Sequence, residues 1–254
     1  MSENHELKVQ ASATFLHAGA RPDQEDHALI LEDKRIFVVA DGFGGPVPGA
    51  QASQTACDAV RNFLFKEAGD LDATLPFELR SYFSLAGNVL FNALVHANKK
   101  VKKLNKGKDV HEKGGASVLA GFMDGDLLAI ASVGACSAWL FREGEARELV
   151  MPRTYARLVD PFHPDHHADF QVPLMAMGIS DDLEPEIFEY RMKPGDWLLF
   201  QTDGLTSAAR ETIATLQTLG ISSGRPPREA IIEALEMLRQ GSYLDNAAAS
   251  IVIF

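Results

Sequence analysis

Three aspartates stand beside apolar runs of strand length. Asp41 follows IFVVA, Asp203 follows WLLFQT, and Asp245 comes shortly before AAASIVIF. A polar turn explains each of them taken singly, because Asp-Gly and similar pairs are common in turns. If the strands are neighbours, however, the three carboxylates collect at one edge, at a high cost for each charge withdrawn from water. Mg²⁺ or Mn²⁺, which prefer oxygen ligands, would reverse that cost.

Two of these aspartates are followed by glycine, Gly42 and Gly204. Glycine lets an ion approach the backbone closely and leaves its carbonyl oxygen accessible as a ligand. Two divalent cations about 3.5–4 Å apart, joined by a carboxylate, can activate water for attack on a phosphate. On spacing alone, the metal centre and the ordinary turn both stay open.

A polar segment before the first of these strands adds three further candidates. In ARPDQEDHALI, Arg21 precedes Glu25 and Asp26 by four and five residues. Arginine binds phosphate oxygens through a planar, bidentate fork, and the two acids could face the water of a metal ion. By itself, this segment is more typical of a solvated polar loop.

The elements that must position these residues are predicted from hydrophobic periodicity. Short alternating or apolar runs between turn residues predict strands, and apolar residues three and four apart predict helices. Residues 151–180, with their Pro and His content, are predicted to form a long irregular excursion. The predicted strands are 7–16, 27–32, 35–40, 117–123, 127–133, 137–142, 146–150, 187–192, 196–202 and 247–254, and the predicted helices are 52–63, 83–101, 206–219 and 228–240.

Most of the predicted strands are joined to a neighbour by a short turn, as at residues 33–34, 124–126 and 143–145. Such hairpins pair strands antiparallel and disfavour a doubly wound parallel sheet. Strands grouped between pairs of helices predict an α+β fold, a β-sandwich of two antiparallel sheets flanked by α-helices on both outer faces. No linker-like shift, repeat or low-complexity tract interrupts the sequence, so residues 1–254 are predicted to form a single domain.

The composition argues against several classes of protein. The net charge of −11 disfavours a nucleic-acid binder, and the basic cluster at 98–108 is predicted to continue a helix into a solvated loop. No apolar run approaches the ~20 residues that span a membrane, and the first ten residues lack a signal-peptide core. The two cysteines, Cys57 and Cys136, lie in apolar sequence, so we expect buried thiols and a cytoplasmic location.

Six segments in order resemble the motifs of the metal-dependent, type 2C (PPM) serine/threonine protein phosphatase family, in its bacterial type. RPDQED is similar to that family's Arg-x-x-Asn-Glu-Asp, with Gln24 where Asn is usual. VVADGFGGPVPGAQAS resembles its Asp-Gly-Met-Gly-Gly and Gly-x-x-Ala-Ser signature. GASVLAG, LAIASVGACSAWLF, PGDWLLFQTDGLTSA and DNAAASIVI resemble the remaining motifs. Each motif alone is weak, but six in order over nearly the whole chain are a strong signal.

The resemblance implies a cleft at one end of the sandwich that holds two Mn²⁺ or Mg²⁺ ions. Asp41 would bridge the two ions. The Gly42 carbonyl would bind one of them, and Asp203 and Asp245 would bind the other. The acting nucleophile in this family is water, so no nucleophilic Cys or Ser is required.

The same resemblance gives roles to the polar segment before the first strand. Glu25 or Asp26 would complete the second metal site, directly or through water. Arg21 would bind the substrate phosphate. Asn246 would orient its neighbour Asp245 without touching a metal itself.

Three features depart from the family pattern or lie outside it. Ala135 replaces the Asp of the family's Gly-Asp-Ser-Arg, a ligand of a third, weaker metal in related enzymes, so a third metal site is in doubt. Phe43 stands where animal relatives carry a His that is a candidate general acid, so leaving-group protonation has to come from water or elsewhere. The segment with His163, His166 and His167 is predicted to be a solvated loop, with a metal site, a general acid or a substrate contact as the alternatives.

The predicted function is a Mn²⁺/Mg²⁺-dependent hydrolase that removes phosphate from phosphoserine and phosphothreonine in proteins. We expect a monomer with a role in signalling, whose partners are phosphorylated targets of a serine/threonine kinase. A pseudophosphatase that binds phosphoproteins is the alternative, although the retained acids argue against it. No residue distinguishes a protein substrate from a small phosphorylated metabolite.

Overall fold

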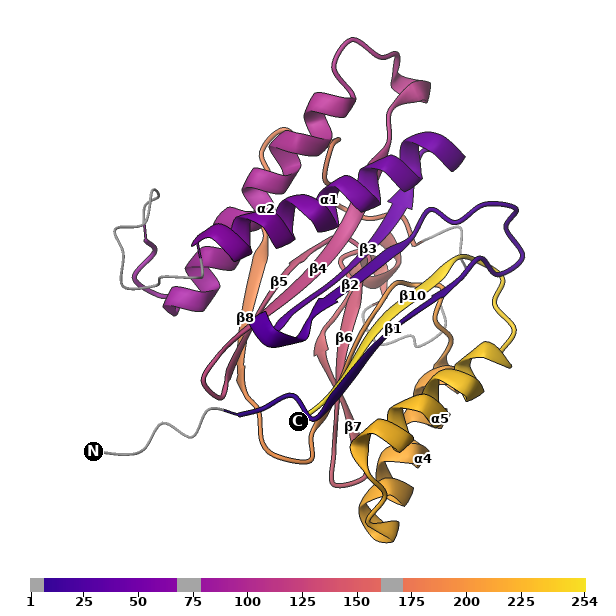
Figure 1. Cartoon of the computed structure of the whole chain (residues 1–254). Helices are drawn as coiled ribbons and strands as arrows, with labels where there is room; N and C mark the ends of the chain where they lie inside the picture. The colour runs from indigo at the N-terminus through magenta and orange to yellow at the C-terminus, as the bar shows by residue number, and fades with distance from the viewer. Residues whose placement is uncertain (1–6, 68–78, 161–170) are drawn as a thin grey trace.

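The computed structural model of the chain describes residues 7–67, 79–160 and 171–254. In these residues ten strands form two five-stranded sheets that pack face to face (Figure 1). Every paired strand in both sheets is antiparallel. The α+β sandwich predicted from the sequence is therefore confirmed.

The first sheet joins segments that are far apart in the sequence. Its strand order is β1-β10-β9-β6-β7, so Ser250 pairs with Thr14 on one side while Ala249 pairs with Gln201 on the other. The strands are β1 (Ala11–His17), β6 (Ser137–Arg142), β7 (Glu145–Val150), β9 (Trp197–Gln201) and β10 (Ala247–Ile253).

The second sheet is built largely from hairpins between consecutive strands. Its order is β2-β3-β4-β5-β8. A short 3₁₀ turn, Glu32–Lys34, joins β2 to β3, with Arg35 in the left-handed conformation, which confirms the hairpin predicted there. The strands are β2 (His27–Leu31), β3 (Ile36–Phe43), β4 (Gly115–Asp124), β5 (Leu127–Val133) and β8 (Glu186–Arg191).

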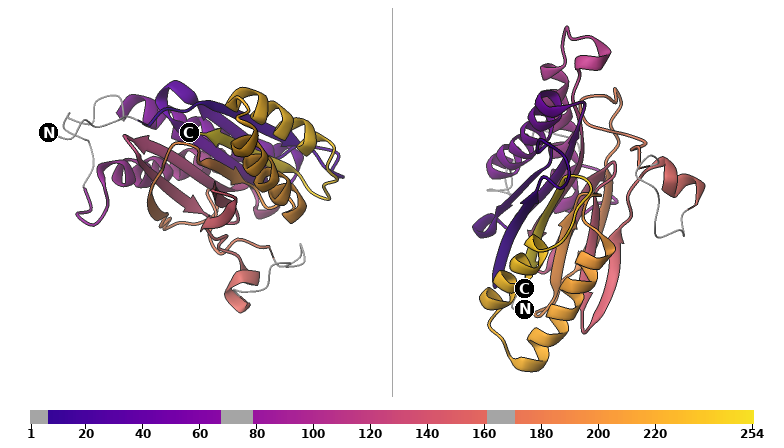
Figure 2. Two further views of the ribbon diagram at one scale, coloured as in Figure 1. Left: turned by 90° about the horizontal axis from the view of Figure 1, so that it is seen from below. Right: turned by 90° about the vertical axis from the view of Figure 1, so that its right-hand side faces the viewer.

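Helices cover both outer faces of the sandwich (Figures 1 and 2). The helices α1 (Pro46–Glu67) and α2 (Leu85–Leu104) pack on the second sheet, whereas α4 (Ser207–Ser223) and α5 (Pro227–Arg239) pack on the first. Side-chain caps fix two of these starts, because Ser84 Oγ accepts a hydrogen bond from the Gly87 N–H and Thr206 Oγ1 accepts one from the Ala209 N–H.

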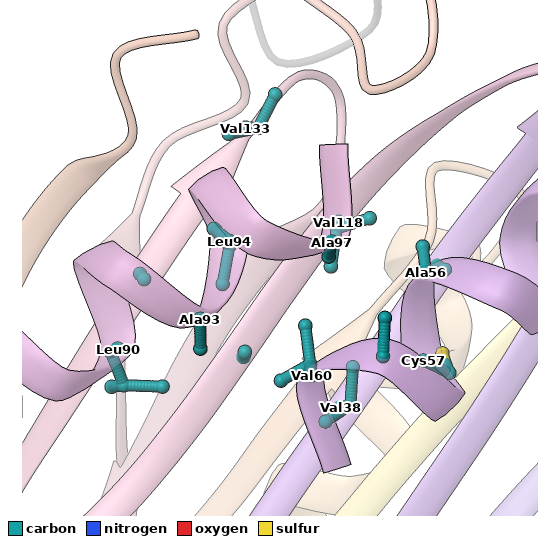
Figure 3. Packing of buried hydrophobic residues seen from close by; sticks show 14 of the residues in the cluster. Val38, Ala56, Cys57, Val60, Leu90, Ala93, Leu94, Ala97, Val118 and Val133 are labelled. Carbon is teal, nitrogen blue, oxygen red and sulfur yellow. The ribbon is translucent and has the colours of Figure 1, made fainter. Parts of the chain in front are cut away.

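The core between the second sheet and its helices is made of small and medium-sized side chains. Ala56, Val60 and Leu94 lie between the helices and the strands, and all three are fully buried (Figure 3). The core between the two sheets contains larger rings, with Phe37 packed edge-on against Phe200 at 6.4 Å between centroids. The two apolar layers hold the strand ends in fixed positions.

The structure differs from the predicted elements at several of their ends, among them the end of β3, which continues through Asp41 and Gly42 to Phe43, and the starts of the first helix and the first strand. The helix predicted over 52–63 begins at Pro46 in the structure. The prediction missed this start because the sequence PVPG shows no helical periodicity. Proline nevertheless fits the first turn of a helix, where its missing N–H is not needed. The strand predicted from residue 7 begins at Ala11. The described parts of 151–180 contain only one short helix, α3 (Tyr155–Val159), which projects away from the sandwich (Figure 2).

Two further predictions concern burial. The thiols of Cys57 and Cys136 are fully buried, as predicted, and burial raises the pKa of both. Among the described residues, no helix combines the length and the apolar character needed to cross a membrane.

Candidate metal centre

The predicted site residues converge because four strand ends meet at one end of the sandwich. In the antiparallel pairs β2–β3 and β9–β10, the C-terminal ends of β3 and β9 lie beside the start of β2 and of β10. A cavity of about 840 Å³ opens there. Its lining includes all eight predicted site residues: Arg21, Glu25, Asp26, Asp41, Gly42, Asp203, Asp245 and Asn246.

Three carboxyl groups in this cavity have raised pKa values. Burial raises the pKa of Asp26 to about 7, although a hydrogen bond from Thr202 acts in the opposite direction. Burial and then the charges of Asp203 and Asp26 raise the pKa of Asp41 well above its usual range. Desolvation in the cleft, followed by the charge of Asp245, raises the pKa of Asp203 to about 6. The groups therefore resist ionising together, and a divalent cation would relieve their repulsion.

Arg21 and Asp245 form a bidentate ion pair at the cavity. Arg21 Nε donates to Asp245 Oδ1 at 2.9 Å, and Arg21 Nη2 donates to Asp245 Oδ2 at 2.7 Å. Their side chains are 59% and 42% exposed. Because exposed ion pairs contribute little free energy, either partner can exchange this contact for another ligand at small cost.

The residues in the cavity have the oxygen ligands that a metal centre needs, but their side chains are not arranged around a common point where an ion could bind. Within residues 7–67, 79–160 and 171–254, no three His, Cys, Asp or Glu side chains are grouped so as to hold one ion. Asp245, which the family pattern places on the same ion as Asp203, has both carboxylate oxygens on Arg21 instead. The donors are nonetheless carboxylate and carbonyl oxygens, the ligands that Mg²⁺ and Mn²⁺ prefer. The centre that the family pattern implies would require Asp245 to exchange its contact with Arg21 for one with a metal ion.

Glu25 lies against the start of α1. Its Oε2 atom is buried and has no hydrogen-bond partner among the described residues. Burial raises the pKa of Glu25, while a hydrogen bond from the backbone N–H of Gly45 opposes the rise. Because buried polar atoms are nearly always paired, this oxygen is a candidate ligand for a metal or its water. A side chain at Gly49 would overlap it, which explains the glycine in GAQAS.

Asn246 connects the loop before β2 to the start of β10. Its Nδ2 donates to the carbonyl oxygens of Ala18 and Asp23, both at 2.8 Å, and its Oδ1 accepts from the Glu25 N–H at 2.7 Å. The Asn246 backbone N–H donates to Asp245 Oδ1 at 2.8 Å. The side chain predicted to orient Asp245 is thus bonded to the loop that carries Glu25.

Two hydroxyl groups that sequence reasoning missed support the same site. Thr202 Oγ1 donates to Asp26 Oδ2 at 2.8 Å and accepts from the Ala248 N–H at 2.8 Å. Ser53 Oγ donates to the Glu25 carbonyl oxygen at 2.5 Å. Thr202 belongs to the motif segment QTDG and Ser53 to the motif segment GAQAS. Membership of these segments was the only feature of the sequence that could have marked the two hydroxyl groups as site residues.

Steric crowding, and not only access for an ion, explains why glycine follows Asp41 and Asp203. A Cβ atom at Gly42 would overlap the carbonyl oxygens of Gly49 and Glu25, and one at Gly204 would overlap the carbonyl oxygen of Asn246. These close approaches bring the N-terminal end of α1, the loop before β2 and the start of β10 together. Each Asp-Gly pair therefore closes the cavity as well as supplying a carboxylate.

The departures from the family pattern also lie near the cavity. Phe43 is part of its lining, and Ala135 is buried and lines an adjoining cavity. A methyl group at this position offers no ligand, so nothing in this wall supports a third metal site. His163, His166 and His167 lie outside the described residues.

Comparisons with known proteins agree with the motifs. No protein-family model matches the chain. In sequence, it is 26% identical over 234 residues to the serine/threonine protein phosphatase PstP of Mycobacterium tuberculosis, an alignment that covers 89% of this chain and 41% of PstP. The chain therefore spans about two fifths of the length of the curated relatives it matches.

Solved structures share the fold over nearly the whole chain. The catalytic domain of PstP in complex with two manganese ions matches with a TM-score of 0.74 and 21% identity, covering 97% of this chain and 99% of that one. The PPM Ser-Thr phosphatase MsPP from Mycobacterium smegmatis matches with a TM-score of 0.74 and 21% identity, covering 98% and 100%. Stp1 from Staphylococcus aureus matches at 0.75 and 16%, covering 98% and 97%. The resemblance to bacterial PPM-type serine/threonine phosphatases that the motifs predict is thereby confirmed, in sequence by PstP and in fold by all three structures.

Proposed function

We propose that this chain is a metal-dependent protein phosphatase that hydrolyses phosphoserine and phosphothreonine at a dinuclear Mn²⁺ or Mg²⁺ centre. The observation that carries the proposal is the convergence of Asp26, Asp41 and Asp203 in one cavity, with raised pKa values. A binding module has no physical need for such mutually repelling acids, whereas a cation site does.

In the proposed centre, the carboxylates of Asp41, Asp203 and Asp245 and the carbonyl oxygen of Gly42 would hold the ions. Glu25 or Asp26 would complete the second site, directly or through water. Bound cations would lower the pKa of a water molecule and neutralise phosphate charge. A hydrogen bond from Thr202 favours the charged form of Asp26, and bound cations would favour it further.

Arg21 and Asp245 are proposed to exchange partners when substrate binds. The guanidinium that now holds the Asp245 carboxylate would take the phosphate, because a carboxylate and a phosphate each offer two oxygens that the same guanidinium fork can bind. The carboxylate released in this way is free to turn toward Asp203. Phosphate binding and completion of the metal centre would then favour each other.

The test is release of inorganic phosphate from a phosphothreonine peptide, measured with Mn²⁺ and again with excess EDTA. We expect release that requires the metal and that is lost in Asp41→Asn. A matched exposed-acid control, Glu236→Gln on α5, should leave the rate unchanged.

Two results would favour the other candidates. Peptide binding without any phosphate release at saturating Mn²⁺ would favour the phosphoprotein-binding pseudophosphatase. Rapid hydrolysis of small phosphorylated metabolites, with none of the peptide, would replace the protein substrate by a metabolite.

We also propose, in line with the relatives, that the substrates are phosphoproteins modified by a serine/threonine kinase. The described sandwich is proposed to act as one phosphatase domain and as a monomer. Sedimentation of the purified chain at working concentration tests the oligomeric state.

A further inference from the structure

A second cavity of about 560 Å³ adjoins the candidate metal centre. The two cavities share Gln171, Asp203 and Asp245 in their linings. The second one extends from there over β6 and β9 of the first sheet to the start of α4. A polypeptide with one residue at the metal centre could therefore place a nearby side chain in this cavity, since an extended chain advances about 3.3 Å per residue.

Two arginines from different elements line this second cavity. Arg157 belongs to α3, and its side chain is only 19% exposed. Arg210 belongs to α4, where its guanidinium carbon lies 4.9 Å from the centre of the Trp139 ring. Arg210 Nη1 also donates to the Leu205 carbonyl oxygen at 3.2 Å. Both guanidinium groups are therefore held in the wall rather than spread into solvent.

One carboxylate, Glu148, lies beside the two arginines. Its Oε1 is 3.5 Å from Arg157 Nη2, at the limit of a hydrogen bond. Burial raises the pKa of Glu148, and the charges of Arg157 and Arg210 oppose that rise. Asp203 and Asp245 belong to both cavities. The other charged side chains in the lining of the second cavity are the cations Arg157 and Arg210 and the partly desolvated anion Glu148.

Further features of the wall point to a polar occupant. The helix α4 is 17 residues long, and its first residues, with the cap Thr206, lie in the lining, so the positive end of its dipole faces the cavity. Trp139 Nε1 and Gln201 Oε1 are buried and have no hydrogen-bond partner among the described residues. Such atoms are rare in a sealed core.

We propose that this cavity, lined by Arg157 and Arg210, is a subsite for an oxyanion on the substrate polypeptide, close in sequence to the phosphorylated residue. The oxyanion is a carboxylate of Asp or Glu, or a second phosphate. The position of the subsite relative to the scissile phosphate rests on the proposed function. The subsite makes the protein selective for acidic or multiply phosphorylated segments.

The test compares three phosphothreonine peptides that differ only within three residues of the phosphothreonine. One carries Glu there, one carries Gln, and one carries phosphoserine in place of a single Glu. With Mn²⁺, we expect kcat/KM for the Glu peptide to exceed that for the Gln peptide by about 10-fold, the scale of one charge-assisted contact. A larger effect with phosphoserine assigns the second phosphate as the preferred group, and a larger effect with Glu assigns the carboxylate.

Three variants locate the effect. Arg157→Gln and Arg210→Gln should each reduce the preference for the Glu peptide and leave hydrolysis of a small aryl phosphate unchanged, which also shows that they fold. Glu148→Gln should increase the preference, because it removes a carboxylate that lies beside Arg157. Arg239→Gln, an exposed arginine in the last turn of α5, is the matched control and should change nothing.

A binding measurement separates this proposal from the proposed function. Titration of the Glu and Gln peptides against the full chain, followed by the fluorescence of Trp139 and Trp197, needs no turnover. If no peptide is hydrolysed but the Glu peptide binds more tightly and only through Arg157 and Arg210, the subsite stands and the phosphatase fails. Equal binding and hydrolysis of the Glu and Gln peptides, or a preference that survives both arginine substitutions, overturns the subsite.

Discussion

The strand β9 has an aspartate at each end, and the two differ in their burial and in their partners. Asp196, just before the strand, is 1% exposed and accepts hydrogen bonds from Arg142 Nε at 2.7 Å, Arg142 Nη2 at 2.6 Å and the Lys193 N–H at 2.7 Å. Asp203, just after the strand, faces the acids Asp41 and Asp245. The first carboxylate is neutralised by the fold, whereas the second depends on a partner from outside.

This difference separates a structural acid from a functional one on physical grounds. Both aspartates flank the same apolar strand, and both precede or follow a turn that contains glycine. What distinguishes them is that a guanidinium, Arg142, donates two hydrogen bonds to the Asp196 carboxylate, whereas the nearest charges around Asp203 include other carboxylates. Substitution should therefore lower stability at the Asp196 end and lower activity at the Asp203 end.

The largest effect is expected from Asp41→Asn. The change keeps the shape of the side chain but removes the charge that would join two cations, so kcat should fall by about 10³-fold or more. The stability of the EDTA-treated protein should be equal to or above that of the unsubstituted chain, because one repelling acid is gone. Steady-state kinetics and urea denaturation measure the two effects, and near-normal turnover would contradict the two-metal assignment. Asp203→Asn and Asp245→Asn should act in the same direction.

Arg21→Ala should have the next largest effect, seen mainly in KM. The change removes a charge-assisted contact to phosphate worth about 2–3 kcal/mol in both the ground state and the transition state. KM for a phosphothreonine peptide should rise while kcat changes little. A fall in kcat at constant KM would show that Arg21 acts on the reaction step instead.

Asp196→Asn tests the opposite end of β9. The amide keeps only one of the two acceptor oxygens and cannot neutralise Arg142, so we expect the free energy of unfolding to fall by about 2 kcal/mol. The value of kcat/KM at saturating metal should stay unchanged. Denaturant unfolding gives the first quantity, and loss of activity in folded protein would show that the two ends of the strand are not independent.

A further expected effect is a pH dependence of stability in EDTA. The pKa of Asp26 is raised to about 7 and that of Asp203 to about 6, against about 3.9 in an unfolded chain. The folded state therefore holds extra protons between about pH 4 and pH 7, and stability falls as the pH rises through this window. Tm in EDTA should be lower at pH 8 than at pH 5, and Mn²⁺ should restore it. A Tm that is independent of pH in this window would contradict the repulsion.

The sequence predicted the sandwich and the site through different kinds of signal. Hydrophobic periodicity located the strands because both sheets bury apolar side chains on a regular repeat, as the fully buried β10 shows. It missed the first turn of α1, where proline and glycine carry no periodicity. The convergence of Asp41, Asp203 and Asp245 could be predicted only from the order of family motifs, because spacing along a chain does not say which strand ends meet.

The partners of single side chains could not be predicted. Nothing in the sequence indicated that Asp245 would face Arg21, or that Asn246 would bond to Ala18 and Asp23, since these contacts join segments more than two hundred positions apart. The second cavity was missed for the same reason. Its arginines, Arg157 and Arg210, come from an excursion and a helix with no shared motif.

The placement of β10 between β1 and β9 also has a consequence for how the molecule is made. Asn246 and Asp23 are 223 positions apart, and their hydrogen bond closes the candidate site. A chain emerging from the ribosome cannot join β1 to the rest of the first sheet until β10 is synthesised, and pairing over such separations is slow. The second sheet, formed from local hairpins, can assemble earlier. The acids of the candidate site would then come together only after β10 has paired, so a nascent fragment that lacks β10 would lack the complete site.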